Sequence, residues 1–171
     1  VSVIVPNDYP EFLKWMKNDD LIINFSNAKA ESQDKIKNAS LIFCLDFNNL
    51  TRINELGDYI SEANAKKVLI DHHLDPSDFY DFKIHDVKAS ATAELVYDFL
   101  VDLDSSAIDK DISEAIYTGI LTDTGSFKFS MSPKVHNIVA DLMSRGVDIS
   151  FINNKIYDSN SLDKLKLIGY A

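Results

Sequence analysis

The sequence lacks the features that stabilise small secreted proteins or anchor proteins in membranes. Its one cysteine, Cys44, lies in the apolar run Leu41–Leu45. A disulfide framework is therefore excluded, and we expect the thiol to be a small core residue of a reduced, cytosolic protein. No apolar stretch approaches the roughly 20 residues that a membrane-spanning helix needs. The chain also has no internal repeat, low-complexity tract or linker rich in glycine and serine.

Basic residues are in short supply. The 171 residues include 17 Lys and Arg against 27 Asp and Glu, a net charge of −10. This balance excludes binding of long duplex nucleic acid through a general basic surface. Small phosphorylated substrates remain compatible with it, because a metal ion can neutralise their charge locally. With 46% hydrophobic and 26% charged residues, the composition is that of a soluble globular domain with a sizeable core.

Apolar runs and amphipathic segments alternate along the chain. The runs predict strands over residues 1–5, 21–23, 41–45, 68–70 and 82–85. Helical patterns cover residues 11–16, a polar segment through 35, and 53–63, 92–103, 112–122, 133–145, 148–157 and 162–170. The alternation predicts an α/β fold, an open and mostly parallel sheet flanked by helices, whose strands are covered on both faces. Ligands are expected at the carboxyl ends of the strands.

Several expected helix ends carry residues suited to capping. At the starts these are Ser90, Asp111 with Glu114 as a capping box, Ser132 before Pro133, and Asp148. Gly146 is expected just beyond the end of the helix that begins at Pro133.

Three acidic residues follow apolar segments: Asp46, Asp71 and Asp123. Each alone is more often a turn former than a ligand. The ends of parallel strands lie side by side, however, so Asp46 and the triplet Asp71-His72-His73 should meet at one edge of the sheet. Carboxylates with imidazoles and no thiolate are typical ligands of Mn²⁺ or Mg²⁺ rather than of structural zinc. Two such ions about 3.5–4 Å apart would stabilise the attacking and leaving oxygens of a phosphoryl displacement.

These residues occur in recognisable motifs. Three of them, in order along the chain, are Leu45-Asp46-Phe47-Asn48, Ile70-Asp71-His72-His73 and Gly119-Ile120-Leu121-Thr122-Asp123-Thr124-Gly125. Together these three resemble motifs of the DHH family of phosphoesterases. The segment Ser90-Ala91-Thr92-Ala93-Glu94-Leu95 also resembles a helix start common in the subgroup of this family that acts on very short RNA and 3′-phosphoadenosine 5′-phosphate. The resemblance implies a DHH-type catalytic domain over residues 1–157. Residues 158–171 would then begin a linker helix towards a substrate-binding domain.

The resemblance also implies a role for each site residue. Asp46 would bridge two metal ions, His72 would bind one of them, and Asp123 would complete the cluster. His73 would face the substrate phosphate or the attacking water, and Asp71 would orient an imidazole. Because successive side chains of a strand point to opposite sides, His72 and His73 should not be equivalent.

Four further residues are weaker candidates for contacts with a substrate phosphate. Arg52 could bind a phosphate bidentately, or lie on the surface at a helix start. Ser90 and Thr92 are helix caps in the alternative interpretation, and Lys128 follows the glycine turn. The remaining histidines, His85 and His136, are not expected to be metal ligands.

One family motif has no counterpart here. Nothing before Asp46 matches the family's His-x-x-x-Asp-x-Asp motif, and no histidine precedes His72. We therefore expect the chain to be an internal part of a longer phosphoesterase, with weak metal binding and slow turnover by itself.

The predicted activity is metal-dependent hydrolysis of short oligoribonucleotides or 3′-phosphoadenosine 5′-phosphate. It would use two divalent cations, for which Mn²⁺ is the favoured ion and Mg²⁺ the alternative. Alternatives within the family are a cyclic dinucleotide phosphodiesterase and an exopolyphosphatase or pyrophosphatase. A catalytically degenerate nucleotide-binding module is the alternative of another class. We expect a cytoplasmic protein whose partners are short RNA or a phosphorylated nucleotide, with no membrane contact and with a homodimer as one option for its assembly.

Overall fold

The computed structural model describes residues 1–129, 132–158, 166–167 and 169–170 of the chain. Its strands are β1 (Val3–Val5), β2 (Ile22–Asn24), β3 (Leu41–Leu45), β4 (Lys66–Asp71) and β5 (Phe82–His85). Every strand pair is parallel, and the pairs form a two-stranded sheet, β1-β2, and a three-stranded sheet, β3-β4-β5. The predicted α/β architecture is confirmed, although the strands are divided between two sheets rather than joined in one.

Helices lie on both sides of this arrangement. They are α1 (Lys29–Lys37), α2 (Leu56–Glu62), α3 (Thr92–Asp104), α4 (Lys110–Asp123), α5 (Pro133–Ser144) and α6 (Ile149–Asn153). Short 3₁₀ turns occupy Glu11–Leu13, Asp19–Leu21, Leu50–Ile53 and Ser105–Ala107, and a π-helical turn covers Asn154–Asp158. Most of the helix expected over residues 162–170 lies outside the described residues, so that helix and the domain boundary before it stay predictions.

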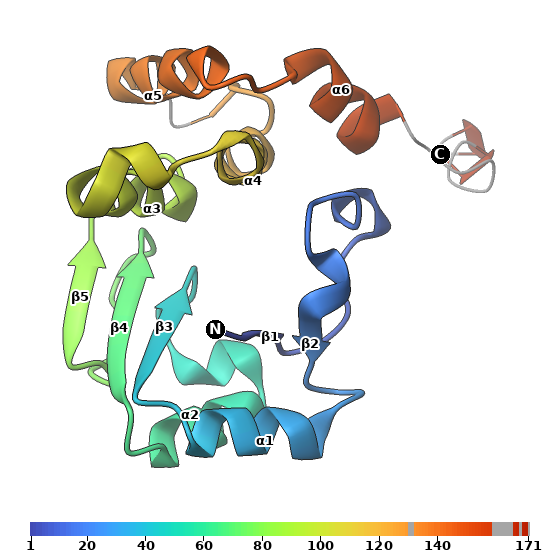
Figure 1. Cartoon of the computed structure of the whole chain (residues 1–171). Coiled ribbons are helices and arrows are strands. Elements are labelled where there is room, and N and C mark those ends of the chain that lie inside the picture. Colours follow the sequence, from blue (N-terminus) through green and yellow to red (C-terminus); the bar gives the residue numbers. More distant parts are fainter. Residues whose placement is uncertain (130–131, 159–165, 168, 171) are drawn as a thin grey trace.

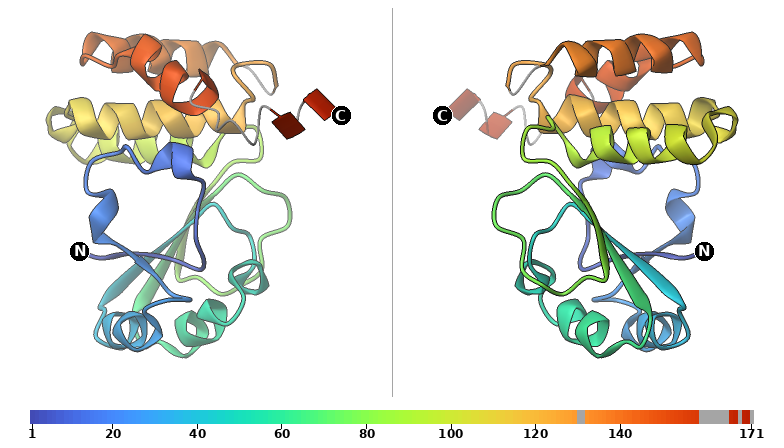
Figure 2. Two further views of the ribbon diagram at one scale, coloured as in Figure 1. Left: turned by 90° about the vertical axis from the view of Figure 1, so that its right-hand side faces the viewer. Right: turned by 90° about the vertical axis from the view of Figure 1, so that its left-hand side faces the viewer.

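The carboxyl ends of β3, β4 and β5 point towards α3 and α4, while α1 and α2 lie at the other end (Figure 1). Two further views show α3, α4 and α5 as a helical layer beyond the strand ends (Figure 2). The ends of the strands and the start of α3 therefore meet at the boundary between strands and helices. This is where the sequence predicts the site.

One face of the three-stranded sheet is well covered. Cys44 and Leu69 are paired across β3 and β4 and are 1% and 0% exposed, in a core that includes residues of α1 and α2. Burial raises the pKa of the Cys44 thiol to about 11, as expected of an unreactive core residue. On the other face Ile70 packs with Leu95 of α3.

The expectation that the strands are covered on both faces is wrong for β3. Its alternate residues Leu41, Phe43 and Leu45 remain 43–47% exposed. They point away from the face that α1 and α2 cover.

The helical layer is held together by a second core, built around Tyr117, Ile120, Leu121, Val135, Leu142 and Ile152. Helices α3 and α4 cross closely at Gly119, where an added Cβ would lie 2.8 Å from the Cβ of Ala93. Glycine at this position therefore allows the end of α4 to approach the start of α3.

The helix predicted over residues 53–63 is interrupted. Leu50–Ile53 forms a 3₁₀ turn, Asn54 adopts a positive φ of 53°, and α2 begins only at Leu56. The chain turns back tightly here, since a Cβ on Gly57 would come within 2.4 Å of the carbonyl oxygen of Leu50.

Two predicted helix caps are also wrong. The N-cap of α3 is Ala91, not Ser90, and that of α4 is Asp109, whose carboxylate accepts from the Ile112 N–H at 2.9 Å. Asp111 thus lies inside the first turn of α4 rather than starting it.

The later caps are confirmed. Ser132 accepts from the Val135 N–H at 3.3 Å with Pro133 in the first turn of α5, and Asp148 caps α6 through the Phe151 N–H at 2.9 Å. Gly146 follows α5 with a φ of 96°. None of the helices in the described ranges is both long and apolar enough to cross a membrane.

Candidate functional site

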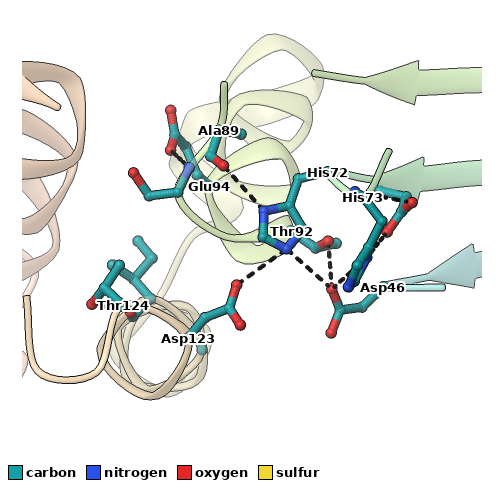
Figure 3. A network of polar contacts seen from close by, with 12 residues as sticks. Asp46, His72, His73, Ala89, Thr92, Glu94, Asp123 and Thr124 are labelled. Atoms are coloured by element: carbon teal, nitrogen blue, oxygen red, sulfur yellow. Dashed lines mark hydrogen bonds and ion pairs between the residues drawn. The ribbon is translucent and has the colours of Figure 1, made fainter. Parts of the chain in front are cut away.

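Asp46 stands at the end of β3 in an unusual backbone conformation. Its N–H still donates to the carbonyl of Ile70 on β4 at 3.1 Å, but its φ is +66°. Asp is among the few residues other than glycine that accept this left-handed region, and such residues often occur at functional sites. Its Oδ1 accepts a hydrogen bond from Thr92 Oγ1 at 2.8 Å, in the first turn of α3 (Figure 3).

His72 points between two carboxylates. Its Nε2 lies 3.3 Å from Asp123 Oδ2 and 3.8 Å from Asp46 Oδ1, and its Nδ1 is 3.0 Å from the carbonyl oxygen of Ala89 (Figure 3). A carbonyl only accepts hydrogen bonds, so Nδ1 carries the proton. Nε2 is then the ring nitrogen that faces the carboxylates and whose lone pair would bind a metal ion placed between them.

His73 is oriented by Asp71, the last residue of β4. Nδ1 of the ring lies 2.7 Å from Asp71 Oδ1, and its backbone N–H donates to Oδ2 at 3.2 Å. Asp71 is fully buried, at 0% exposure. The carbonyl of His73 accepts in turn from His85 Nε2 at 2.7 Å. Asp71 thus makes the contact with an imidazole that its expected orienting role requires, and the role itself stays a prediction.

The two adjacent histidines lie closer together than strand geometry predicts. Their ring centroids are 4.8 Å apart, at 74° to each other. Because β4 ends at Asp71, both rings belong to the following loop and the alternation of a strand does not separate them. Asp46 Oδ1 lies between them, 3.8 Å from His72 Nε2 and 3.9 Å from His73 Nδ1.

Asp123 ends α4 and comes to the same point from the helical layer. Burial raises the pKa of its carboxyl group, the Asp46 carboxylate raises it further, and the two imidazoles act in the opposite direction. The next residue, Thr124, is fully buried, and its hydroxyl donates to the Ile120 carbonyl at 2.7 Å. Gly125 then turns the chain with a φ of 56°. The turn holds Asp123 at the helix end.

The donor set fits a divalent cation. One ligand atom each from Asp46, His72 and His73 lies within 4.8 Å of the other two, and Asp123 borders His72. Carboxylate oxygens and neutral imidazole nitrogens suit Mn²⁺ or Mg²⁺. The one cysteine of the chain is buried in the core and offers no thiolate.

The weaker candidates divide into two groups. Thr92 reaches the cluster through its hydroxyl, and Ser90 is buried at 3% exposure directly before α3. Arg52 and Lys128 are exposed, and among the described residues neither side chain makes a hydrogen bond or ion pair with the cluster.

Sequence reasoning did not identify two contacts that support the site, the Ala89 carbonyl on His72 and His85 on the His73 carbonyl. A backbone carbonyl leaves no pattern in a sequence. His136 lies over Phe127, with ring centroids 6.4 Å apart.

Comparison with known proteins gives a consistent assignment. The model of the DHH family, N-terminal domain, matches residues 2–120. The "bifunctional oligoribonuclease and PAP phosphatase NrnA" of Thermus thermophilus is 35% identical over 150 residues, 87% of this chain, and its Bacillus subtilis counterpart is 26% identical over 151 residues, 86% of this chain. A crystal structure of an exopolyphosphatase-related protein from Bacteroides fragilis superposes with a TM-score of 0.97 and 40% identity over 99% of this chain.

These relatives are longer proteins. The matched region is 42% of the Thermus protein, 47% of the Bacillus protein and 51% of the Bacteroides chain. The family match covers well over half of the present chain and includes Asp46 and the Asp71-His72-His73 triplet. On this evidence the chain belongs to the DHH family.

Proposed function

We propose that this chain carries the metal centre of a phosphoesterase that hydrolyses short oligoribonucleotides or 3′-phosphoadenosine 5′-phosphate. The observation that carries the proposal is the convergence of Asp46, His72 and Asp123 from β3, the end of β4 and α4. The substrate class is supported by the names of the Thermus and Bacillus relatives, which describe an oligoribonuclease and PAP phosphatase.

Asp46, His72 and Asp123 would hold a divalent cation, and Asp46 would share its carboxylate with a second one. When bound, such cations neutralise phosphate charge and lower the pKa of water. Mn²⁺ is the first choice and Mg²⁺ the second, since both favour oxygen ligands and imidazole is acceptable to Mn²⁺. The local positive charge would offset repulsion between the substrate and a chain of net charge −10.

His73 has a different part in the proposal. Its Nδ1–H is held by the buried Asp71, so Nε2 is the nitrogen left to accept a proton or to contact a phosphate oxygen. Asp71 fixes the ring but does not touch the substrate. Thr92 holds Asp46 Oδ1 by a hydrogen bond and so restricts the carboxylate rotamer. Arg52, Ser90 and Lys128 stay candidates for phosphate contacts.

Replacing Asp46 tests the proposal. Asp46→Asn keeps the shape and the tolerance for a positive φ but removes the charge that two cations would share. In the longer phosphoesterase of which we expect this chain to be a part, Mn²⁺-dependent phosphate release from 3′-phosphoadenosine 5′-phosphate should fall about a hundredfold or more in kcat, with a smaller change in KM. Asp102→Asn, the same exchange at an exposed position of α3 outside the cluster, serves as a comparison. Asp46→Asn with more than half of the original turnover would contradict the proposed role.

A second candidate activity is favoured by the Bacteroides structure, which is described as exopolyphosphatase-related. Polyphosphate or pyrophosphate would use the same metal centre with a different substrate contact. Comparing kcat/KM for dinucleotides, cyclic dinucleotides, 3′-phosphoadenosine 5′-phosphate, pyrophosphate and polyphosphate under one set of conditions separates these activities. A chain that binds nucleotide with Mn²⁺ but hydrolyses none of them would be the degenerate module.

A further inference from the structure

The orientation of His72 depends on a backbone carbonyl. Its Nδ1–H donates to Ala89 O at 3.0 Å, and this bond directs Nε2 towards Asp46 and Asp123. Ala89 belongs to a short segment between β5 and α3 that no sheet pairing holds in place. The position of that segment therefore decides where the imidazole points.

The start of α3 lacks its usual side-chain cap. Its N-cap is Ala91, in an extended conformation (φ −158°, ψ 152°), and the hydroxyl of Thr92 is used on Asp46. The carboxylate of Glu94, in the first turn of the helix, reaches back and accepts from the Ser90 N–H at 2.8 Å (Figure 3). This is a capping-box-like contact. The Ser90 N–H and the Ala89 carbonyl belong to one planar peptide group, so this bond also fixes the carbonyl that His72 uses.

Glu94 is buried, and its charge has a partner in another helix. Only 3% of the residue is exposed, and Oε1 lies 3.1 Å from Nζ of Lys134 in α5. Lys134 also contacts Asp98 Oδ2 at 2.5 Å. A cation in the first turn of a helix is repelled by the positive end of the helix dipole. The location of Lys134 is therefore not explained by the stability of α5. It compensates the buried carboxylate of Glu94 instead.

We infer that Glu94, paired with Lys134, is a positioning residue for the metal centre. It holds the Ser90 N–H, this fixes the Ala89 carbonyl, and the carbonyl sets the tautomer and direction of His72. Glu94 itself contacts neither substrate nor metal. The inference rests on the proposed function only in treating His72 as a ligand, and it adds a chain of contacts from α5 to that ligand.

Two substitutions at Glu94 provide graded tests. Glu94→Ala removes the acceptor, and Glu94→Gln keeps the volume while replacing a charged acceptor by a weaker neutral one. With Mn²⁺ alone as the probe, calorimetry should show affinity about tenfold weaker for Glu94→Ala, the range found when groups supporting a metal ligand are lost. For Glu94→Gln we expect a loss of roughly threefold from the same cause.

The tautomer of His72 gives a readout that needs no metal and no activity. In the metal-free wild-type chain at a pH where the ring is neutral, nitrogen NMR should show Nδ1–H as the dominant form. Glu94→Ala should shift His72 towards a mixture of tautomers. A purely structural role for Glu94 would lower the melting temperature without changing this ratio.

Asp98→Asn is the matched control, because Asp98 also contacts Lys134 but does not touch the segment before α3. It should leave both the Mn²⁺ affinity and the His72 tautomer within twofold of wild type. If Glu94→Ala does not fold, Glu94→Gln against Asp98→Asn decides the question. A folded Glu94 variant with both readouts within twofold of the control overturns the inference. Wild type that fails to bind Mn²⁺ would instead count against the proposed function, while the tautomer test would still stand.

Discussion

At the scale of single residues, the adjacent histidines have different surroundings. His72 directs Nε2 towards Asp46 and Asp123, whereas the ring of His73 is held by the buried Asp71. We therefore expect His72→Ala to weaken Mn²⁺ binding by 10–100-fold or more, as is typical when a metal shell is disrupted. His73→Ala should chiefly lower turnover.

Calorimetry with Mn²⁺ and an assay of phosphate release separate the two effects. His85→Ala is a useful comparison for His73, because it removes only the contact to the His73 carbonyl. Equal losses of Mn²⁺ affinity in His72→Ala and His73→Ala would show that both rings bind the cation equally.

Asp123 carries an electrostatic cost in the metal-free chain. Burial raises the pKa of its carboxyl group, and the neighbouring Asp46 adds to the rise. Because the pKa of this carboxyl group is raised in the folded state, the protonated group favours the folded state over the unfolded one. This contribution to the free energy of unfolding is fully present below the ordinary carboxyl pKa of about 3.9 and is lost as the pH rises through the raised value. At pH 7 the ionised side chain therefore destabilises the metal-free fold.

Asp123→Asn should raise the melting temperature of the metal-free chain slightly at pH 7, and the gain should vanish below about pH 3.9. The gain is small, under about 1 kcal/mol, because the side chain is 40% exposed and its interactions are screened by solvent. The same variant should lose the stabilisation that Mn²⁺ confers. Thermal melts at both pH values, with Asp102→Asn as an exposed control, measure the difference; a lower melting temperature at pH 7 would refute the argument.

At the scale of elements, the close crossing of α3 and α4 brings Asp123 to the site. Gly119 lies one turn before Asp123, and an added Cβ would be 2.8 Å from that of Ala93. Gly119→Ala would gain about 1 kcal/mol in helix propensity, but the clash should cost about 1–3 kcal/mol and move α4 outward. We expect a net loss of stability and weaker Mn²⁺ binding, measured by denaturant unfolding and calorimetry.

The double variant Gly119→Ala with Ala93→Gly removes the opposing methyl group. It should recover Mn²⁺ affinity relative to Gly119→Ala alone, because space for the crossing is restored. If the single variant binds Mn²⁺ as wild type does, the crossing does not position Asp123.

Much of this element order can be predicted from sequence, for identifiable reasons. The apolar run before Asp46 and the one before Asp71 each form a parallel strand, so the two acids and the histidines meet at one edge. The break between the turn Leu50–Ile53 and α2 could not be predicted, because it depends on Gly57 packing against a carbonyl. The N-cap of α3 could not be predicted either. The Thr92 hydroxyl contacts Asp46 and the Glu94 carboxylate contacts Lys134 of α5, and these contacts depend on the tertiary structure.

At the scale of the whole molecule, the candidate site brings together residues of the strands and of the helical layer. Asp46 and His72 follow strands, while Asp123 ends α4 of the helical layer (Figure 3). A cation held by all three would therefore link the strands to the helical layer. Any ligand that binds only the folded state stabilises it by mass action.

Mn²⁺ at 100 times its Kd should stabilise the fold by about 2.7 kcal/mol. For a chain of this size that corresponds to a rise in melting temperature of roughly 5–10 °C.

The net charge of −10 makes a control for ionic screening necessary, because any divalent cation relieves repulsion among surface acids. Asp46→Asn retains nearly all of that surface charge but loses the carboxylate at the centre of the cluster, so it should show only the small rise due to screening. Equal rises in the wild type and in Asp46→Asn at matched ionic strength would place the bound cation elsewhere on the acidic surface, and the link between strands and helical layer would have to come from protein contacts alone.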